Sequence, residues 1–89
     1  MTPVSESGNY ANLTSTTTVT TSPGALLGVW VSSASGSPTI KVQDGSATMA
    51  NTFTPVSATW YPLPFRFSTS LVVTIGGTVD CTASWSPGG

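Results

Sequence analysis

The chain has 89 residues, of which 30 are Thr or Ser and only five are charged, and its net charge is −1. A domain this short buries little more than about 60% of the surface that its unfolded chain exposes, so it commonly needs help from disulfides, a metal or other subunits. A lone cysteine and the absence of His exclude the first two, and two basic residues are too few for nucleic-acid binding, so association with other subunits is expected.

The N-terminal half predicts two strands after a flexible arm. Residues 1–11 have the composition of a disordered segment. The Thr-rich run 12–21 favours a strand and ends at a Pro-Gly turn signal. Residues 25–33 form a nearly continuous apolar run, typical of a strand covered on both faces, and the Ser-Gly-Ser-Pro stretch at 35–38 should end it. Trp30 is expected to be buried in this strand.

The C-terminal half predicts further short strands. Residues 39–44 alternate between apolar and polar side chains, as half-buried strands do, and end at an Asp-Gly turn. Short strands are expected near 48–53 and 63–67, where prolines limit regular pairing. The stretch 71–85 predicts two strands joined through a Gly-Gly pair. Its inward residues should be Leu71, Val73, Ile75, Val79, Cys81, Ala83 and Trp85.

Six or seven short strands separated by Gly and Pro, with no helix, predict a small antiparallel β-sandwich of the jelly-roll or immunoglobulin-like kind. A small barrel is the alternative. The domain should span residues 12–86, followed by a flexible tail at 87–89.

Catalysis is not expected from these residues. No His is present to activate a serine, and Asp44 and Asp80 lie at or near predicted turns. Cys81 has the inward parity of a strand and is interpreted as a small buried hydrophobic residue. The sequence therefore predicts no catalytic, cofactor-binding or metal-binding residues.

The exposed aromatic residues are the candidate interface. Trp60 and Tyr61 are adjacent, and neighbouring strand residues face opposite sides, so at least one of them should point outward. With Tyr10 they form the predicted contact surface. A subunit interface is the first interpretation, and a stacking surface for a sugar is the second.

Residues 9–85 resemble a family of small virion proteins of tailed bacteriophages. The resemblance is in the order of the stretches "NYANLTSTTTVTTSPGALLGVWVSS", "PTIKVQDG" and "FTPVSATWYPLPFRFSTSLVVTIGGTVDCTASW". It implies a β-sandwich with a structural role, either decorating or cementing the capsid or forming a small part of the tail, and it supplies no catalytic residues.

The expected function is therefore that of a non-enzymatic capsid decoration or cement protein that stabilises the assembled shell. Its expected partners are the major capsid protein or other virion proteins and further copies of itself, with a trimer favoured; nucleic acid and membranes are not expected partners. The alternative is a tail or fibre component, or a carbohydrate- or receptor-binding module. The missing signal peptide and unpaired cysteine predict synthesis in the host cytoplasm and residence in the virion.

Overall fold

The computed structural model describes residues 9–87, and their regular structure is entirely β-strand. The strands form one antiparallel sheet, built on a long pair made by β3 and β7. No helix that could cross a membrane is found among the described residues. The seven strands are β1 (Asn9–Leu13), β2 (Thr17–Thr20), β3 (Gly24–Asp44), β4 (Ala47–Phe53), β5 (Thr59–Pro62), β6 (Arg66–Phe67) and β7 (Leu71–Pro87).

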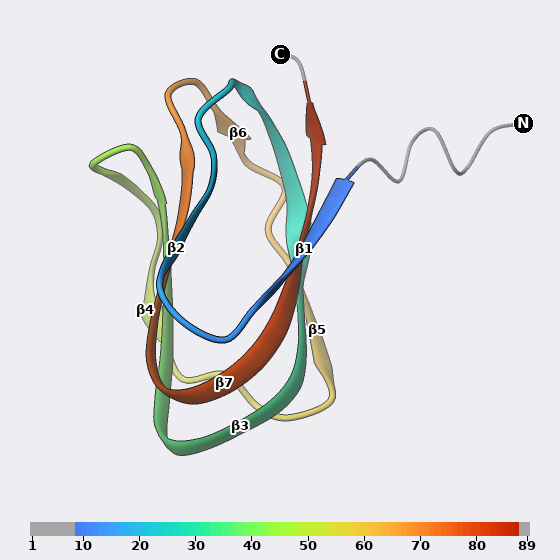
Figure 1. Cartoon of the computed structure of the whole chain (residues 1–89), viewed down its shortest axis with the longest axis vertical. Helices are drawn as coiled ribbons and strands as arrows, with labels where there is room; N and C mark the ends of the chain where they lie inside the picture. The colour runs from blue at the N-terminus through green and yellow to red at the C-terminus, as the bar shows by residue number, and fades with distance from the viewer. Residues whose placement is uncertain (1–8, 88–89) are drawn as a thin grey trace, which may run out of the picture.

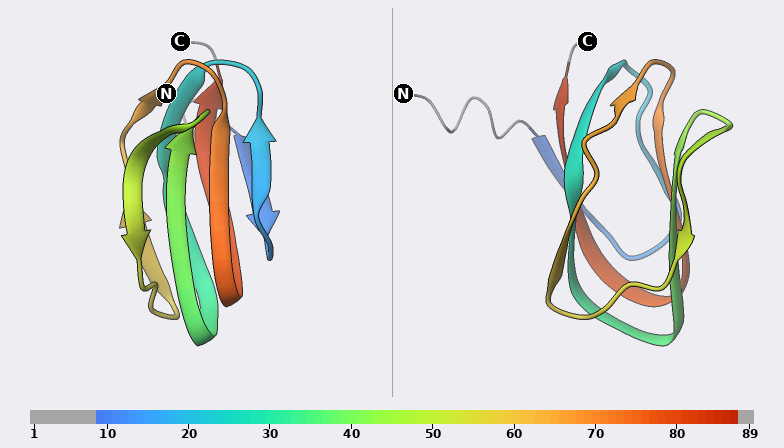
Figure 2. Two further views of the ribbon diagram at one scale, coloured as in Figure 1. Left: turned by 90° about the vertical axis from the view of Figure 1, so that its left-hand side faces the viewer. Right: turned by 180° about the vertical axis from the view of Figure 1, so that it is seen from behind.

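The sheet folds over on itself because β3 and β7 bend together halfway along their length (Figure 1). The first layer consists of β1, β5 and β6 with residues 24–34 of β3 and 78–87 of β7. The second layer consists of β2 and β4 with residues 39–44 of β3 and 71–76 of β7. Figure 2 shows the two layers from the side and from behind. The expected all-β, sandwich-like fold is confirmed.

The bend replaces two strand ends that the sequence predicted. Ser35 lies opposite Thr78 and Thr39 lies opposite Gly76, so three residues of β3 face Gly77 alone. Gly77 has φ +71°, and a Cβ there would lie 2.6 Å from the carbonyl oxygen of Gly36. The prediction that residues 35–38 end one strand and that the Gly-Gly pair separates two others was therefore wrong. Both stretches turn a corner inside a continuous strand.

The predicted strand 12–21 is instead two strands, since β1 pairs with residues 81–85 in the first layer and β2 pairs with residues 71–73 in the second. The chain crosses between the layers at residues 14–16. Residues 9–11, expected in the flexible arm, belong to β1, and Pro87, expected in the flexible tail, is the last residue of β7. Residues 1–8 and 88–89 of the predicted arm and tail lie outside the described part of the chain.

The short strand predicted near 63–67 is also placed differently. The structure has β5 before that stretch and the two-residue β6 at its end. Pro62 is the last residue of β5, and Pro64 lies between the two strands. Both strands pair with the first half of β3. The prolines lack the N–H that a continuous ladder would need, which explains why this edge of the first layer is divided.

The hydrophobic core lies between the two layers. Five of the seven predicted inward residues of β7 are fully buried, and Ile75 and Trp85 are partly buried against them. Every buried side-chain nitrogen or oxygen among the described residues has a hydrogen-bond partner. The buried apolar residues are Leu13, Leu26, Val29, Val31, Ile40, Val42, Phe67, Leu71, Val73, Val79, Cys81 and Ala83.

Candidate interaction surface

Trp30 points outward from the first layer, contrary to the expectation that it is buried. The register of β3 against β7 shifts between Leu26 and Gly28, and after this shift Val29 and Val31 face the core. Successive strand residues alternate between faces, so Trp30 must face the other way. Its side chain is 42% exposed.

Trp60 lies beside Trp30 on the same outer face. The two residues are directly opposite each other in the antiparallel pair of β3 and β5, and Trp60 is 45% exposed. Its indole lies over Gly28, where a Cβ would be 2.6 Å from the ring. Glycine at this position therefore allows one tryptophan to lie flat against the sheet next to the other.

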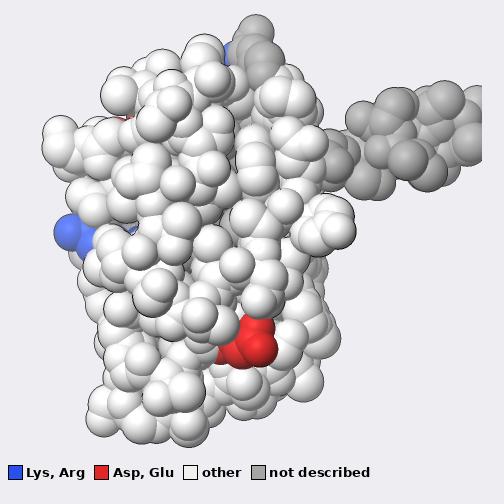
Figure 3. Space-filling model, viewed as in Figure 1, with Lys and Arg blue, Asp and Glu red and all other residues white. Residues whose placement is uncertain are grey.

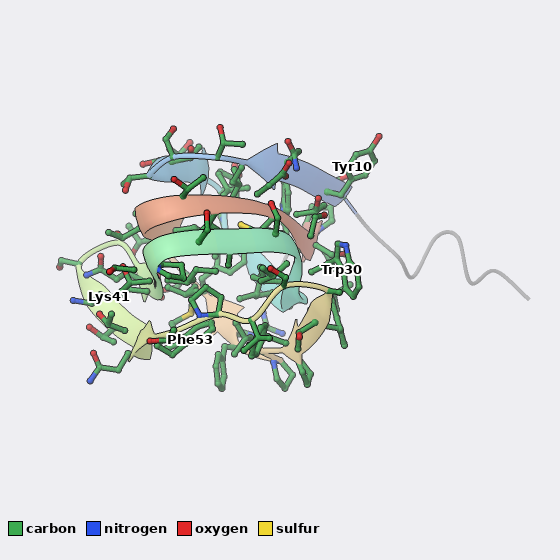
Figure 4. The ribbon with its side chains drawn as sticks, turned by 90° about the horizontal axis from the view of Figure 1, so that it is seen from below. Tyr10, Trp30, Lys41 and Phe53 are labelled. Atoms are coloured by element: carbon green, nitrogen blue, oxygen red, sulfur yellow. The ribbon has the colours of Figure 1, made fainter. Side chains whose placement is uncertain are left out.

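Tyr10 adds a third aromatic side chain to this outer face. Ala11 and Leu13 of β1 face the core, which leaves Tyr10 outward, and it is 78% exposed. It lies opposite Ser84, which in turn lies opposite Gly28. Figure 4 shows Tyr10 and Trp30 at the same side of the molecule. We call Tyr10, Trp30 and Trp60 the aromatic face.

A polar row crosses the sheet next to these rings. Asn12 of β1 lies opposite Thr82 of β7, and Thr82 lies opposite Trp30. The Asn12 amide nitrogen donates hydrogen bonds to the Asp80 carboxylate at 2.8 Å, to the Cys81 carbonyl oxygen at 3.0 Å and to the Thr82 hydroxyl at 3.4 Å. These bonds fix the Asn12 side chain and hold β1 against β7.

Tyr61, predicted as a contact residue with Trp60, points to the opposite side of β5 and packs against the core. Its ring centroid is 5.0 Å from that of Phe53 in the second layer. Its hydroxyl accepts a hydrogen bond from the Val56 N–H at 2.9 Å. The structure therefore separates the two neighbours: Trp60 lies on the aromatic face and Tyr61 joins the layers.

The electrostatics of this side of the molecule are weak. Asp80 is the one charged residue in the polar row, and Lys41 lies on the opposite side of the molecule from Tyr10 and Trp30 (Figure 4). A nearly neutral surface of flat rings, amides and hydroxyls favours apolar packing and hydrogen bonding over the attraction of charged ligands.

The described residues contain no pocket and no group of three or more His, Cys, Asp or Glu side chains that could hold a metal. Cys81 is fully buried between the layers. This burial, with a contribution from the charge of Asp80, raises the pKa of the Cys81 thiol to about 11. The thiol is therefore protonated at neutral pH and is a poor nucleophile. The outer, aromatic side of the first layer is the surface with the features of a binding site.

No family model, curated protein or solved structure matches the chain.

Two residues of this surface were not among the predicted contact residues. Trp30 was placed in the core because its strand is apolar throughout, and the sequence carries no sign of the register shift between Leu26 and Gly28 that turns it outward. Asn12 has no local signal for its role, because its partners are about 70 residues away along the chain.

Proposed function

We propose that the protein is a non-enzymatic structural protein that docks on a larger assembly through the aromatic face. In the setting implied by the sequence resemblance, this assembly is a bacteriophage virion, and the protein decorates or cements its shell as an oligomer. Its partner there is the major capsid protein or another virion protein.

The observation that carries this proposal is the pairing of two half-exposed tryptophans on one outer sheet face. Tryptophan and tyrosine are enriched at the centres of protein interfaces, where each provides a large apolar area with little loss of conformational freedom. Here Trp60 is held over Gly28 before any partner binds, so docking would cost little ordering.

The charge-poor surface supports the same proposal. Seen from the side of β1 and β2, the described part of the molecule shows few charged atoms (Figure 3). Hydroxyl and amide groups lose their water at much lower cost than unpaired charges, so they suit a surface that is covered in an assembly. Decoration of a shell requires a surface complementary to the shell and no catalytic group.

The test is co-sedimentation of the purified protein with empty shells of the phage that encodes it. We expect binding at a ratio fixed by the shell lattice and an increase in the temperature at which the shells fall apart. The double variant Trp30→Ala, Trp60→Ala should bind about thirtyfold more weakly or worse, because it removes two central aromatic contacts. Its far-UV circular dichroism should match that of the unmodified protein.

Val56→Ala is the matched control, since Val56 is 61% exposed but lies in the loop before β5, outside the aromatic face. This variant should bind shells normally. Loss of binding in the control, or full binding by the double tryptophan variant, would contradict the assignment of the aromatic face as the docking surface.

A second candidate is carbohydrate binding by the same surface. The specific observation in its favour is the polar row of Asn12, Asp80 and Thr82 next to Trp30 in the register of the sheet. Flat rings stack on the apolar face of a sugar, while neighbouring amides and carboxylates bind its hydroxyls. A glycan array separates the two candidates, because a glycan-binding module would bind defined sugars and leave shell stability unchanged.

A further inference from the structure

The free edges of the sheet differ in how well they are protected from pairing with another chain. At the edges of the second layer, β4 has two register shifts against β3 and β2 has one against β7. At one edge of the first layer, β5 ends at Pro62, and Pro64 lies between β5 and β6. Bulges and prolines of this kind prevent regular pairing with a further strand.

The remaining edge, β1, has none of these features. Its five residues pair with β7 in one unbroken register, from Asn9 opposite Trp85 to Leu13 opposite Cys81, and they include no proline and no charged residue. Among the described residues, no strand pairs with the other side of β1. In an antiparallel ladder, alternate residues direct their N–H and C=O groups to each side, so β1 presents a set of backbone donors and acceptors outward.

We propose that β1 is a self-pairing edge, at which two copies of the chain join their β1 strands antiparallel about a two-fold axis through Ala11. With Ala11 opposite Ala11, Tyr10 lies opposite Asn12 of the second copy and Asn9 lies opposite Leu13 of the second copy, so all five residues find a partner. This inference goes beyond docking by the aromatic face and does not depend on it.

The composition of β1 suits a second copy as the occupant. Ala11, the residue at the axis, is the smallest in the strand, and its side chain faces inward against the core, so nothing bulky stands between the two strands. No like charges meet in the paired strands, because β1 has no charge. Figure 3 views the molecule from this edge and shows that few charged atoms surround it. The charge that contacts β1 is the Asp80 carboxylate, which accepts a hydrogen bond from Asn12. Asp80 lies on β7, one strand away from the junction, so the paired strands themselves bring no like charges opposite each other.

The symmetry has a consequence for the aromatic face. A two-fold axis that joins two edge strands antiparallel must be perpendicular to the sheet, so outward residues of both copies lie on the same side of the joined sheet. Tyr10 of each copy would then lie beside the junction, with Trp30 and Trp60 further out on the same side. Dimerisation would double the aromatic surface that one assembly could contact.

Five residue pairs bury less than the roughly 1,000 Å² expected of a stable interface, so the dimer should be weak in free solution. It should be reinforced where neighbouring copies are held close together on an assembly. An isologous pair of edges closes at two copies, whereas the sequence favoured a trimer.

The test combines native mass with backbone hydrogen exchange on the full chain, from about 10 µM to about 1 mM. We expect the mass to rise from monomer to dimer across this range. In β1, the amides that face β7 should be protected at every concentration, whereas the alternate amides should become protected only as the dimer forms. Tyr10→Lys places a lysine on this edge in both copies. The two lysines lie diagonally across the two-fold axis, so their repulsion should weaken the dimer about tenfold.

Thr48→Lys is the matched control, because it makes the same change of charge on the exposed β4 edge. It should leave dimerisation unchanged. The proposal is overturned by a monomer at all concentrations, by a trimeric mass, by an unweakened dimer of Tyr10→Lys, or by outward amides whose protection does not depend on concentration. A monomer that still binds shells through its tryptophans would overturn this inference and leave the proposed function standing.

Discussion

Asp44 closes the end of the sandwich opposite the bend by holding the turn that leads into β7. Its carboxylate accepts hydrogen bonds from the Ser68 N–H at 2.9 Å, the Thr69 N–H at 2.8 Å and the Ser70 N–H at 3.3 Å, and from the Ser68 hydroxyl at 3.2 Å. The backbone donors, that of Ser68 above all, lower the pKa of Asp44. The charged form of this side chain is therefore the one that stabilises the fold.

Because the pKa of Asp44 is lower in the folded protein than in the unfolded chain, its contribution is complete above the usual Asp value of about 3.9 and is lost as the pH falls through the folded pKa. We expect the urea midpoint to fall between about pH 7 and about pH 3. Asp44→Asn should lower the midpoint at neutral pH and reduce this fall, because its amide group cannot accept the same set of bonds.

Ser68→Ala is a suitable control for this prediction. It removes one hydroxyl bond to Asp44 but keeps the three backbone donors and the charge. Its midpoint should change with pH as in the unmodified protein. If Asp44→Asn and the unmodified protein had parallel pH profiles, the role assigned to this carboxylate would be wrong.

At the scale of elements, the bend in β3 and β7 is the feature that turns one sheet into two layers. Gly36 and Ser37 have positive φ on one strand and Gly77 has positive φ on the other. The strands stay paired through the corner because the extra residues of β3 arch over Gly77. A side chain at Gly77 would occupy the space that this arch requires.

Gly77→Ala should destabilise the protein by more than backbone strain alone. An alanine at positive φ costs about 1–2 kcal/mol. At Gly77 its Cβ would also lie 2.6 Å and 2.7 Å from the carbonyl oxygens of Gly36 and Ser37. Gly36→Ala is the matched comparison, since it has φ +65° and its Cβ would have no neighbour nearer than the Thr78 hydroxyl at 3.8 Å.

Chemical denaturation measures both variants. Gly36→Ala should lose only the strain of about 1–2 kcal/mol, and Gly77→Ala should lose clearly more. Equal losses would show that the corner tolerates a side chain between the strands, contrary to the packing described for the bend.

At the scale of the whole molecule, the two layers share their central strands. β3 and β7 each contribute one half to the first layer and one half to the second, and core residues of both layers pack together. Neither layer can keep its β3–β7 pair if the other layer unfolds. We therefore expect the domain to unfold in a single cooperative transition.

Tryptophan fluorescence offers a direct test, because Trp30, Trp60 and Trp85 all belong to the first layer. Val42→Ala removes buried side-chain volume from the second layer and should cost about 2 kcal/mol. The fluorescence midpoint should shift by this full amount and should coincide with the midpoint from far-UV circular dichroism. A fluorescence midpoint that is unchanged by Val42→Ala would show that the layers unfold separately.

The local chemistry of the sequence determined the fold class and much of the core. The enrichment in Thr and Val, the absence of helix-forming periodicity and the alternation of apolar residues from Leu71 to Trp85 predicted an all-β domain and its inward residues correctly. These properties follow from the alternation of side chains between the two faces of a strand, which depends only on residues that are neighbours in the sequence.

Only the tertiary structure decided which strands continue, how they pair and which aromatic residues share a surface. The Gly-Gly and Ser-Gly-Ser-Pro stretches are compatible with a strand end or with a bend inside a strand. The pairing of β3 with β7 on both sides of these stretches produces the bend. The shift at Leu27 turned Trp30 outward, and β5 placed Trp60 beside it. Such juxtapositions depend on long-range register, which neighbouring residues do not specify.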